Sequence, residues 1–192
     1  MFTCNIVRIL PLVLAALLMT ANAVRTLEQP LNEQLLPTLS DCGKFSKSVA
    51  FVRSYSASAK DHFYTTDAVE MDIAVDKQGY KFQGDAGRVF SYQFGKTVPL
   101  YRMYSVTAKD HFYTTLKWEA ENAVDRLKYT AEGTAAFVYS EQICGGIPFY
   151  RMYNANATDH FYTTSQSQRD NAIIEHGYVD EGIVCYILPT YD

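Results

Sequence analysis

The stretch Asp61-His62-Phe63-Tyr64-Thr65-Thr66 decides the fold, because it returns unchanged at residues 110–115 and again at residues 159–164. Both intervals are 49 residues long and contain no insertion. Flanking residues keep the same register, with an arginine at positions 53, 102 and 151 and a glycine at positions 84, 133 and 182. The chain therefore predicts three copies of one structural unit.

Two strands are predicted at the start of each copy. Leu100–Tyr104 alternates large and polar residues with a period of two, which is typical of a half-buried strand. A short polar loop follows, and the hexapeptide then predicts a second strand that pairs with the first as a hairpin. Phe63 and its equivalents, Phe112 and Phe161, are expected in the core.

A short helix and a last strand complete the predicted unit. Asp67-x-x-Glu70 and Ser165-x-x-Gln168 follow the capping-box pattern of a helix start, and Thr115 is the expected cap in the middle copy. Gly79 and Gly177 stand where a left-handed residue ends a helix. Extended segments at residues 135–139 and 183–187 predict the final strand.

These units predict an α+β, β-dominated fold. A single unit cannot bury both faces of its aromatic strands, so neighbouring units must pack together. We expect a closed pseudo-threefold domain of three strand-strand-helix-strand repeats of 49 residues, trefoil-like or like a small propeller, with few exposed sheet edges. The expected domain spans residues 48–192, with repeats at 48–96, 97–145 and 146–192.

The N-terminal segment predicts secretion. Residues 1–23 contain a basic residue, an apolar run and an Ala-x-Ala cleavage site, as a signal peptide does. The apolar run is shorter than the ~20 residues that a membrane crossing needs. Residues 24–47 carry no repeat marker, and we expect a leader or linker there. The sequence thus predicts an extracellular, monomeric protein without a membrane span.

Three cysteines follow the signal peptide, in a chain expected to reach an oxidising compartment. Cys42 and Cys144 both begin a Cys-Gly dipeptide just ahead of a repeat, so we favour a disulfide between them, although the sequence does not fix the pairing. Cys185 would then be a buried free thiol. Asn156-Ala157-Thr158 is a glycosylation sequon, and a glycan at Asn156 would obstruct a site in the third copy.

The composition excludes one broad class of protein and counts against another. With 48% hydrophobic residues the chain can form a core, which excludes a disordered protein. A net charge of -4 lacks the surplus of basic residues that phosphate neutralisation needs, which counts against a nucleic-acid partner.

The pattern Tyr-Arg-x-Tyr, Asp-His-Phe-Tyr-Thr-Thr and Gly-Tyr-x-x-Glu-Gly resembles a repeat family of uncharacterised function in secreted fungal proteins and bacterial cell-wall-associated proteins. The resemblance covers about residues 48–188 and is clearest in the third copy, at 150–153, 159–164 and 177–182. In bacteria such repeats look like accessory modules of cell-wall hydrolases and lipases. The resemblance implies surface or glycan binding and supplies no catalytic residue. The first copy departs from it, with Gln83 where Glu132 and Glu181 stand.

Repetition of aromatic and polar residues favours binding of extracellular or cell-wall glycans. A sugar ring can stack on tyrosine while arginine, aspartate and histidine hold its hydroxyl groups. Three weak sites on one body also raise avidity on a multivalent surface. The candidate ligand-binding residues are Arg53, Tyr55, Asp61, His62, Arg102, Tyr104, Asp110, His111, Arg151, Tyr153, Asp159 and His160.

Other functions stay open as alternatives. A secreted structural or protein-interaction module without a glycan ligand is the first of these, and a hydrolase or histidine-metal protein is the second. Catalysis is not favoured, because Asp61 and His62 point to opposite faces of one strand and an enzyme does not need three equal sites. Three converging histidines could hold zinc, but no ligand-pair spacing supports this. We therefore assign no catalytic residue, metal or cofactor. Trp118 is unique and is either a ligand platform or a filler.

Overall fold

The computed structural model describes residues 41–190, so the predicted signal peptide and most of the predicted leader lie outside the described residues. About 47% of these described residues lie in strands and 23% in helices. This confirms the predicted β-dominated α+β class. One short 3-10 helix, η1 (Phe45–Lys47), precedes the first strand.

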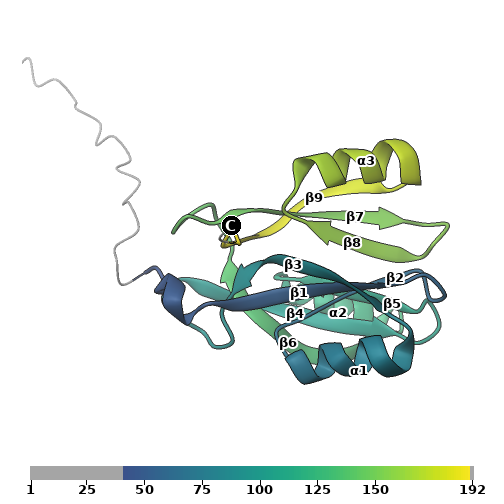
Figure 1. Ribbon diagram of the computed structural model, residues 1–192, viewed down its shortest axis with the longest axis horizontal. Coiled ribbons are helices and arrows are strands. Elements are labelled where there is room, and N and C mark those ends of the chain that lie inside the picture. The colour runs from purple at the N-terminus through teal and green to yellow at the C-terminus, as the bar shows by residue number, and fades with distance from the viewer. Residues whose placement is uncertain (1–40, 191–192) are drawn as a thin grey trace, which may run out of the picture. The chain divides into compact units, whose positions relative to one another are not determined.

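Three consecutive units share the order strand, strand, helix, strand (Figure 1). Unit 1 consists of β1 (Val49–Ser56), β2 (Asp61–Thr65), α1 (Ala68–Gln78) and β3 (Lys81–Val89). Unit 2 consists of β4 (Thr97–Ser105), β5 (Asp110–Thr114), α2 (Lys117–Asp125) and β6 (Thr130–Tyr139). Unit 3 consists of β7 (Ile147–Asn154), β8 (Asp159–Thr163), α3 (Gln166–His176) and β9 (Val179–Ile187).

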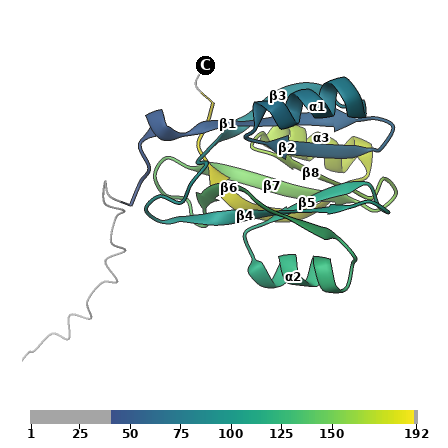
Figure 2. The same cartoon turned by 90° about the horizontal axis from the view of Figure 1, so that it is seen from below.

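Within each unit the first strand is central and pairs antiparallel with the other two. Unit 1 forms a sheet of order β2-β1-β3, and units 2 and 3 share a curled sheet of order β5-β4-β6-β9-β7-β8. Isolated bridges from Arg88 to Leu188 and from Phe90 to Phe137 link the end of unit 1 to the other units. Each helix packs against the strands of its own unit (Figure 2).

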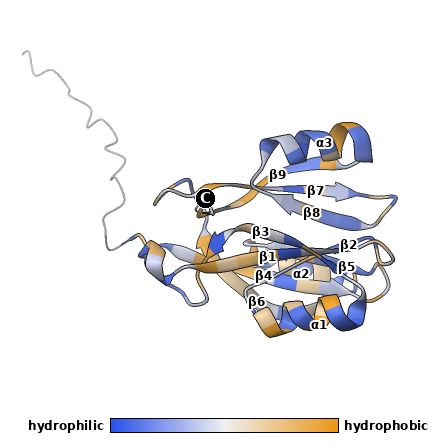
Figure 3. Cartoon of the chain, viewed as in Figure 1, coloured by the Kyte–Doolittle hydropathy of each residue, from blue (hydrophilic) through white to orange (hydrophobic). Residues whose placement is uncertain are grey.

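The main core lies where the three units meet. Each unit contributes one large residue from its first strand, Phe51, Leu100 or Phe149, together with the tyrosine of the hexapeptide. A smaller apolar cluster lies under each helix and contains the expected phenylalanine, Phe63, Phe112 or Phe161, all of which are buried. Hydrophilic and hydrophobic residues are mixed along α1 and α3 (Figure 3), and their buried residues are Met71 and Ala74 in α1 and Ala172 in α3.

Three fully buried tyrosines connect the units through their hydroxyl groups. The hydroxyl of Tyr113 accepts the backbone N–H of Tyr64 at 2.9 Å and donates to the carbonyl of Tyr64 at 2.8 Å. The hydroxyl of Tyr162 makes the same pair of bonds with the backbone of Tyr113, and the hydroxyl of Tyr64 makes it with the backbone of Tyr162. The phenol groups thus satisfy backbone groups that the strand ladders leave unpaired.

The helix starts differ in part from the capping-box prediction. Asp67 caps α1 as expected, because its carboxylate accepts the N–H groups of Val69 and Glu70. The reciprocal bond of a capping box, from the N–H of Asp67 to the Glu70 side chain, does not form. The N–H of Asp67 donates to the hydroxyl of Thr65, and the Glu70 carboxylate accepts from the Thr65 hydroxyl and from Arg102. In the middle copy the prediction of Thr115 as the cap is wrong.

Thr115 of the middle copy donates its hydroxyl to the carbonyl of Val184 in unit 3, so the side chain points away from the helix. The hydroxyl of Thr114 accepts the N–H of Leu116 instead. At the other ends, Gly79 and Gly177 adopt the predicted left-handed conformation, with φ of 78° and 70°.

The last strands of units 2 and 3 begin earlier than predicted, at Thr130 and Val179. In unit 1 the ladder between β1 and β3 shifts register next to the pair Arg53 and Gly84, and Gly84 has a φ of 89°. This bulge requires a residue that tolerates positive φ, which explains the glycine that recurs there.

The predicted disulfide between Cys42 and Cys144 is confirmed, and Cys185 is the predicted buried free thiol. The bond ties the segment before β1 to the loop between units 2 and 3. None of the helices within residues 41–190 combines the length and the apolar character that a membrane crossing requires.

Candidate functional site

Each histidine of the hexapeptide bonds to an aspartate of another unit. The Nδ1–Oδ2 distances are 2.7 Å for His62 and Asp159, 2.6 Å for His111 and Asp61, and 2.6 Å for His160 and Asp110. The other oxygen of each carboxylate accepts the backbone N–H of the same histidine. The prediction that adjacent Asp and His cannot pair within one strand holds, but packing supplies each histidine with an aspartate from elsewhere.

A tyrosine 19 residues further along the chain also donates its hydroxyl to each aspartate. In unit 1, burial and the nearby Asp61 raise the pKa of Tyr80 well above its usual value, so this phenol stays a proton donor. All three aspartates are fully buried. They cannot contact a ligand directly, and they position the histidines instead.

The three aspartates also converge, with one carboxylate oxygen of each within 4.8 Å of the others. Such a group has the right atoms for a metal ion. Each carboxylate, however, already accepts hydrogen bonds from a backbone N–H, an imidazole and a phenol. These donors satisfy the cluster from within the protein, so we assign no metal to it.

Two of the three repeated arginines, Arg102 and Arg151, each take their charge partners from two units. Arg102 binds Glu70 of unit 1 with both terminal nitrogens, at 2.9 and 2.7 Å, and its Nε lies 2.8 Å from Glu132. Burial alone would lower the pKa of Arg102, but these carboxylates outweigh burial and raise the pKa above its usual value. Arg151 is held in the same way by Glu119 and Glu181.

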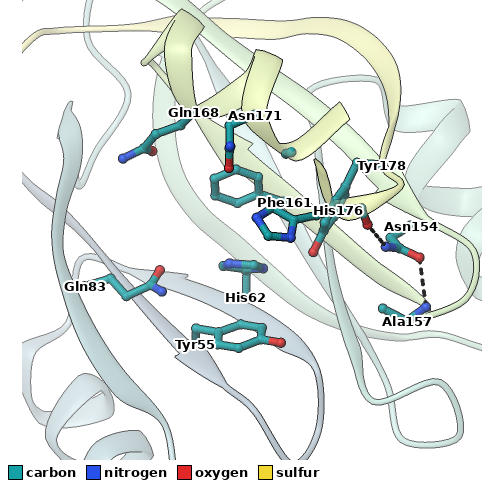
Figure 4. A pocket seen from close by; sticks show the side chains of 11 residues that line it. Tyr55, His62, Gln83, Asn154, Ala157, Phe161, Gln168, Asn171, His176 and Tyr178 are labelled. Carbon is teal, nitrogen blue, oxygen red and sulfur yellow. Dashed lines mark hydrogen bonds between the residues drawn. The ribbon is translucent and has the colours of Figure 1, made fainter. Parts of the chain in front are cut away.

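Aromatic rings enclose each histidine. The His62 ring lies between Tyr55 of its own unit and Phe161 of unit 3, with centroid distances of 4.5 and 4.6 Å (Figure 4). His111 lies in the same way between Tyr104 and Phe63. His160 lies between Tyr153 and Phe112.

A pocket opens at each place where two units meet in this way, which we call a junction and name by the two units. The unit 3–unit 1 pocket has a volume of about 440 Å³ and is lined by Tyr55 and His62 (Figure 4). The unit 1–unit 2 pocket, also about 440 Å³, is lined by Tyr104 and His111. At the unit 2–unit 3 junction His160 and Tyr153 line two adjoining hollows of about 200 and 430 Å³.

The predicted site residues therefore separate into three groups. Tyrosine and histidine line the junction pockets, and the aspartates are buried beneath them. Of the arginines, Arg151 lines the unit 2–unit 3 pocket, whereas Arg53 and Arg102 line neither of the pockets beside His62 and His111. Trp118 is 64% exposed and lines the unit 2–unit 3 pocket, as a ligand platform would. Asn156 is exposed, but its neighbour Ala157 lines the pocket of His62.

Sequence reasoning missed the acidic partners of the arginines. Glu70 was explained by the capping box, although its side chain binds Arg102, 32 residues further along the chain. Glu119 and Arg151 recur at the same interval of 32 residues. That shared spacing is the signal that could have revealed the pair.

The fold and the junctions define a β-dominated domain of three similar units with an aromatic pocket at each junction. Residues 50–188 match the family described as "Domain of unknown function (DUF5648)", and the chain belongs to that family. No curated protein and no solved structure matches the chain significantly.

Proposed function

We propose that this protein is a secreted, non-catalytic module that recognises extracellular or cell-wall carbohydrate through its junction pockets. One observation carries the proposal: each junction presents a half-buried tyrosine next to a histidine that is held rigidly from behind by a buried aspartate. An aromatic face beside fixed polar groups is the arrangement that suits a sugar ring.

The proposed architecture is a closed pseudo-threefold, trefoil-like domain. Its support is that the tyrosine and histidine contacts pass from unit 1 to unit 2, from unit 2 to unit 3 and from unit 3 back to unit 1. A closed body would hold the three pockets at fixed distances. A multivalent glycan surface could then gain ~10²–10⁴-fold in avidity without any new contact.

A catalytic role receives less support from the same geometry. The Nε2 atoms of His111 and His160 face Glu132 and Glu181 at 3.8 and 3.9 Å, and within residues 41–190 neither ring is hydrogen-bonded to a serine, threonine or cysteine that it could activate as a nucleophile. Burial raises the pKa of the Cys185 thiol, which makes it a poor nucleophile. Secretion is supported by the disulfide, which persists in oxidising compartments.

A glycan array with the purified protein, together with pull-down on cell-wall preparations, tests the proposal. The variant Tyr55→Ala/Tyr104→Ala/Tyr153→Ala should lose binding, because it removes the ring face of each pocket. Histidine variants are less useful, since each would leave a buried aspartate without its partner. Tyr92→Ala, which changes an exposed tyrosine outside the pockets, is the matched control.

Absence of binding to every glycan and wall preparation would overturn the proposal and favour a structural or protein-interaction module. Binding that survives the triple tyrosine change would place recognition outside the junction pockets and would equally contradict it.

A further inference from the structure

The unit 3–unit 1 junction lacks both carboxylates that surround the arginine at the other two junctions. Gln168 occupies the position of Glu70 and Glu119, and Gln83 occupies the position of Glu132 and Glu181. The rest of the junction is retained, including the histidine, its aspartate and the two enclosing rings. The replacement therefore removes negative charge while it leaves the framework intact.

Within the described residues, 41–190, Arg53 consequently has no acidic partner. Its Nη1 donates to the amide oxygen of Gln168 at 3.1 Å, and its guanidinium lies over the ring of Phe161 at 5.3 Å. No carboxylate among residues 41–190 lies within 4.0 Å of it. The Nε atoms of all three arginines are buried without an aligned hydrogen bond, but those of Arg102 and Arg151 still lie beside a glutamate.

His62 loses a neighbour for the same reason. At the other junctions a single glutamate oxygen lies beside both cationic side chains: Oε2 of Glu132 is 2.8 Å from Nε of Arg102 and 3.8 Å from Nε2 of His111. The corresponding place, between Arg53 and His62, is bordered by the uncharged amide of Gln83, which is exposed. At each of the other junctions one arginine and two glutamates have a summed charge of minus one. At the unit 3–unit 1 junction the two glutamines are uncharged, so the same three positions have a summed charge of plus one.

The two glutamines that replace the carboxylates both line the unit 3–unit 1 pocket. Gln83 from β3 and Gln168 from α3 line it together with Tyr55 and His62 (Figure 4). Asn171 adds a further amide to the wall. The pocket wall thus combines an aromatic ring with amides that can donate to or accept from hydroxyl groups, and one of these amides, that of Gln168, is hydrogen-bonded to Arg53 behind the wall.

We infer that the unit 3–unit 1 pocket binds a sugar that carries a carboxylate, with that carboxylate in the place that Glu132 and Glu181 occupy at the other junctions. Arginine prefers planar, two-oxygen partners, and at both other junctions its partner is a carboxylate. The sugar ring lies beside Tyr55, and the amides of Gln83 and Gln168 meet its hydroxyl groups. This inference rests on the proposed function and assigns the acidic-sugar class to one junction.

Calorimetry with a galacturonic-acid oligosaccharide tests the inference, and the uncharged galactose oligosaccharide of equal length is the comparison. Wild-type protein should bind the acidic oligosaccharide at one site per chain. The variant Gln83→Glu/Gln168→Glu should weaken that affinity by about tenfold or more, because it supplies Arg53 with internal carboxylates. It introduces only residues that the other junctions already carry, so its melting temperature should not fall. An unchanged affinity would overturn the inference.

The reciprocal variant, Glu119→Gln/Glu181→Gln, provides a gain of function. It leaves Arg151 unpaired in the same way, and a second acidic site per chain should appear. A stoichiometry that stays at one in a folded variant would contradict the inference.

The uncharged galactose oligosaccharide distinguishes the inference about acidic sugars from the proposed function of glycan binding. Binding of neutral glycans without any binding of the acidic oligosaccharide would overturn the inference and leave the proposed function standing. Failure of every glycan, acidic or neutral, would overturn both.

Discussion

His62 Nδ1 lies 2.7 Å from Asp159 Oδ2, although the two residues are 97 positions apart in the sequence. The same carboxylate accepts the backbone N–H of His62 at 2.9 Å and the hydroxyl of Tyr178. One buried side chain therefore joins β2 of unit 1 to β8 and the start of β9 in unit 3. The carboxylate itself is fully buried, so it relies on these three donors in place of water.

Removal of this carboxylate should destabilise the fold. Asp159→Ala leaves two buried donors of His62 and the partly buried hydroxyl of Tyr178 without an acceptor, and we expect the free energy of unfolding to fall by about 3 kcal/mol. Chemical denaturation monitored by tyrosine fluorescence measures the change. Asp76→Ala, at an exposed position on α1, should stay within about 0.5 kcal/mol of wild type. Equal stability of the two variants would refute a structural role for the network.

A single phenol hydroxyl should also matter. Tyr64→Phe leaves the ring in the core but removes the partner of both backbone groups of Tyr162. We expect a loss of about 1–3 kcal/mol, because two buried backbone groups become unpaired. Thermal unfolding is the readout, and Tyr92→Phe at an exposed position is the control. A melting temperature equal to that of the control would show that water can replace the hydroxyl.

The elements of this fold were predictable because their signals are local. Alternation of polar and apolar residues identified the strands, and Asp67 and Gly79 marked the ends of a helix with side-chain and backbone chemistry confined to that helix. A repeat of such a segment allowed each ambiguous copy to be read with the help of the other two.

The candidate site was less predictable, because its contacts join different units. Asp61 and His62 point to opposite faces of β2, so no argument from that strand alone could pair them. Their partners, His111 and Asp159, are set by how the units pack. For the same reason the sequence predicted only a capping role for Glu70, because its contact with Arg102 depends on how units 1 and 2 pack.

Glu70 and Glu119 should make stability depend on acidic pH. Burial alone would raise the pKa of Glu70, but hydrogen bonds from Arg102 and Thr65 outweigh it and lower the pKa below the usual 4.5. Since the folded-state pKa is the lower one, the unfolded chain takes up protons first as the pH falls. The stabilisation is thus present above pH 4.5 and is lost as the pH drops through the folded-state value.

We expect the melting temperature to fall on acidification below about pH 4.5. The variant Glu70→Gln/Glu119→Gln should start from a lower melting temperature at pH 7 and decline less steeply. Glu141→Gln/Glu175→Gln, which changes two exposed glutamates, is the matched control and should follow the wild-type profile. Parallel profiles for all three proteins would show that the arginine pairs do not contribute to acid sensitivity.

The disulfide should stabilise the domain strongly, because Cys42 and Cys144 are separated by 102 residues. Closure of a loop of this length restricts the unfolded chain, and its loss should cost about 4 kcal/mol. Cys42→Ser/Cys144→Ser and the reduced wild-type protein should therefore melt at similar, lower temperatures. Cys185→Ser changes a buried thiol that is not part of the disulfide, so reductant should lower its melting temperature by the same amount as in the wild type. If the double variant had the melting temperature of the oxidised wild type, packing alone would hold the segment before β1.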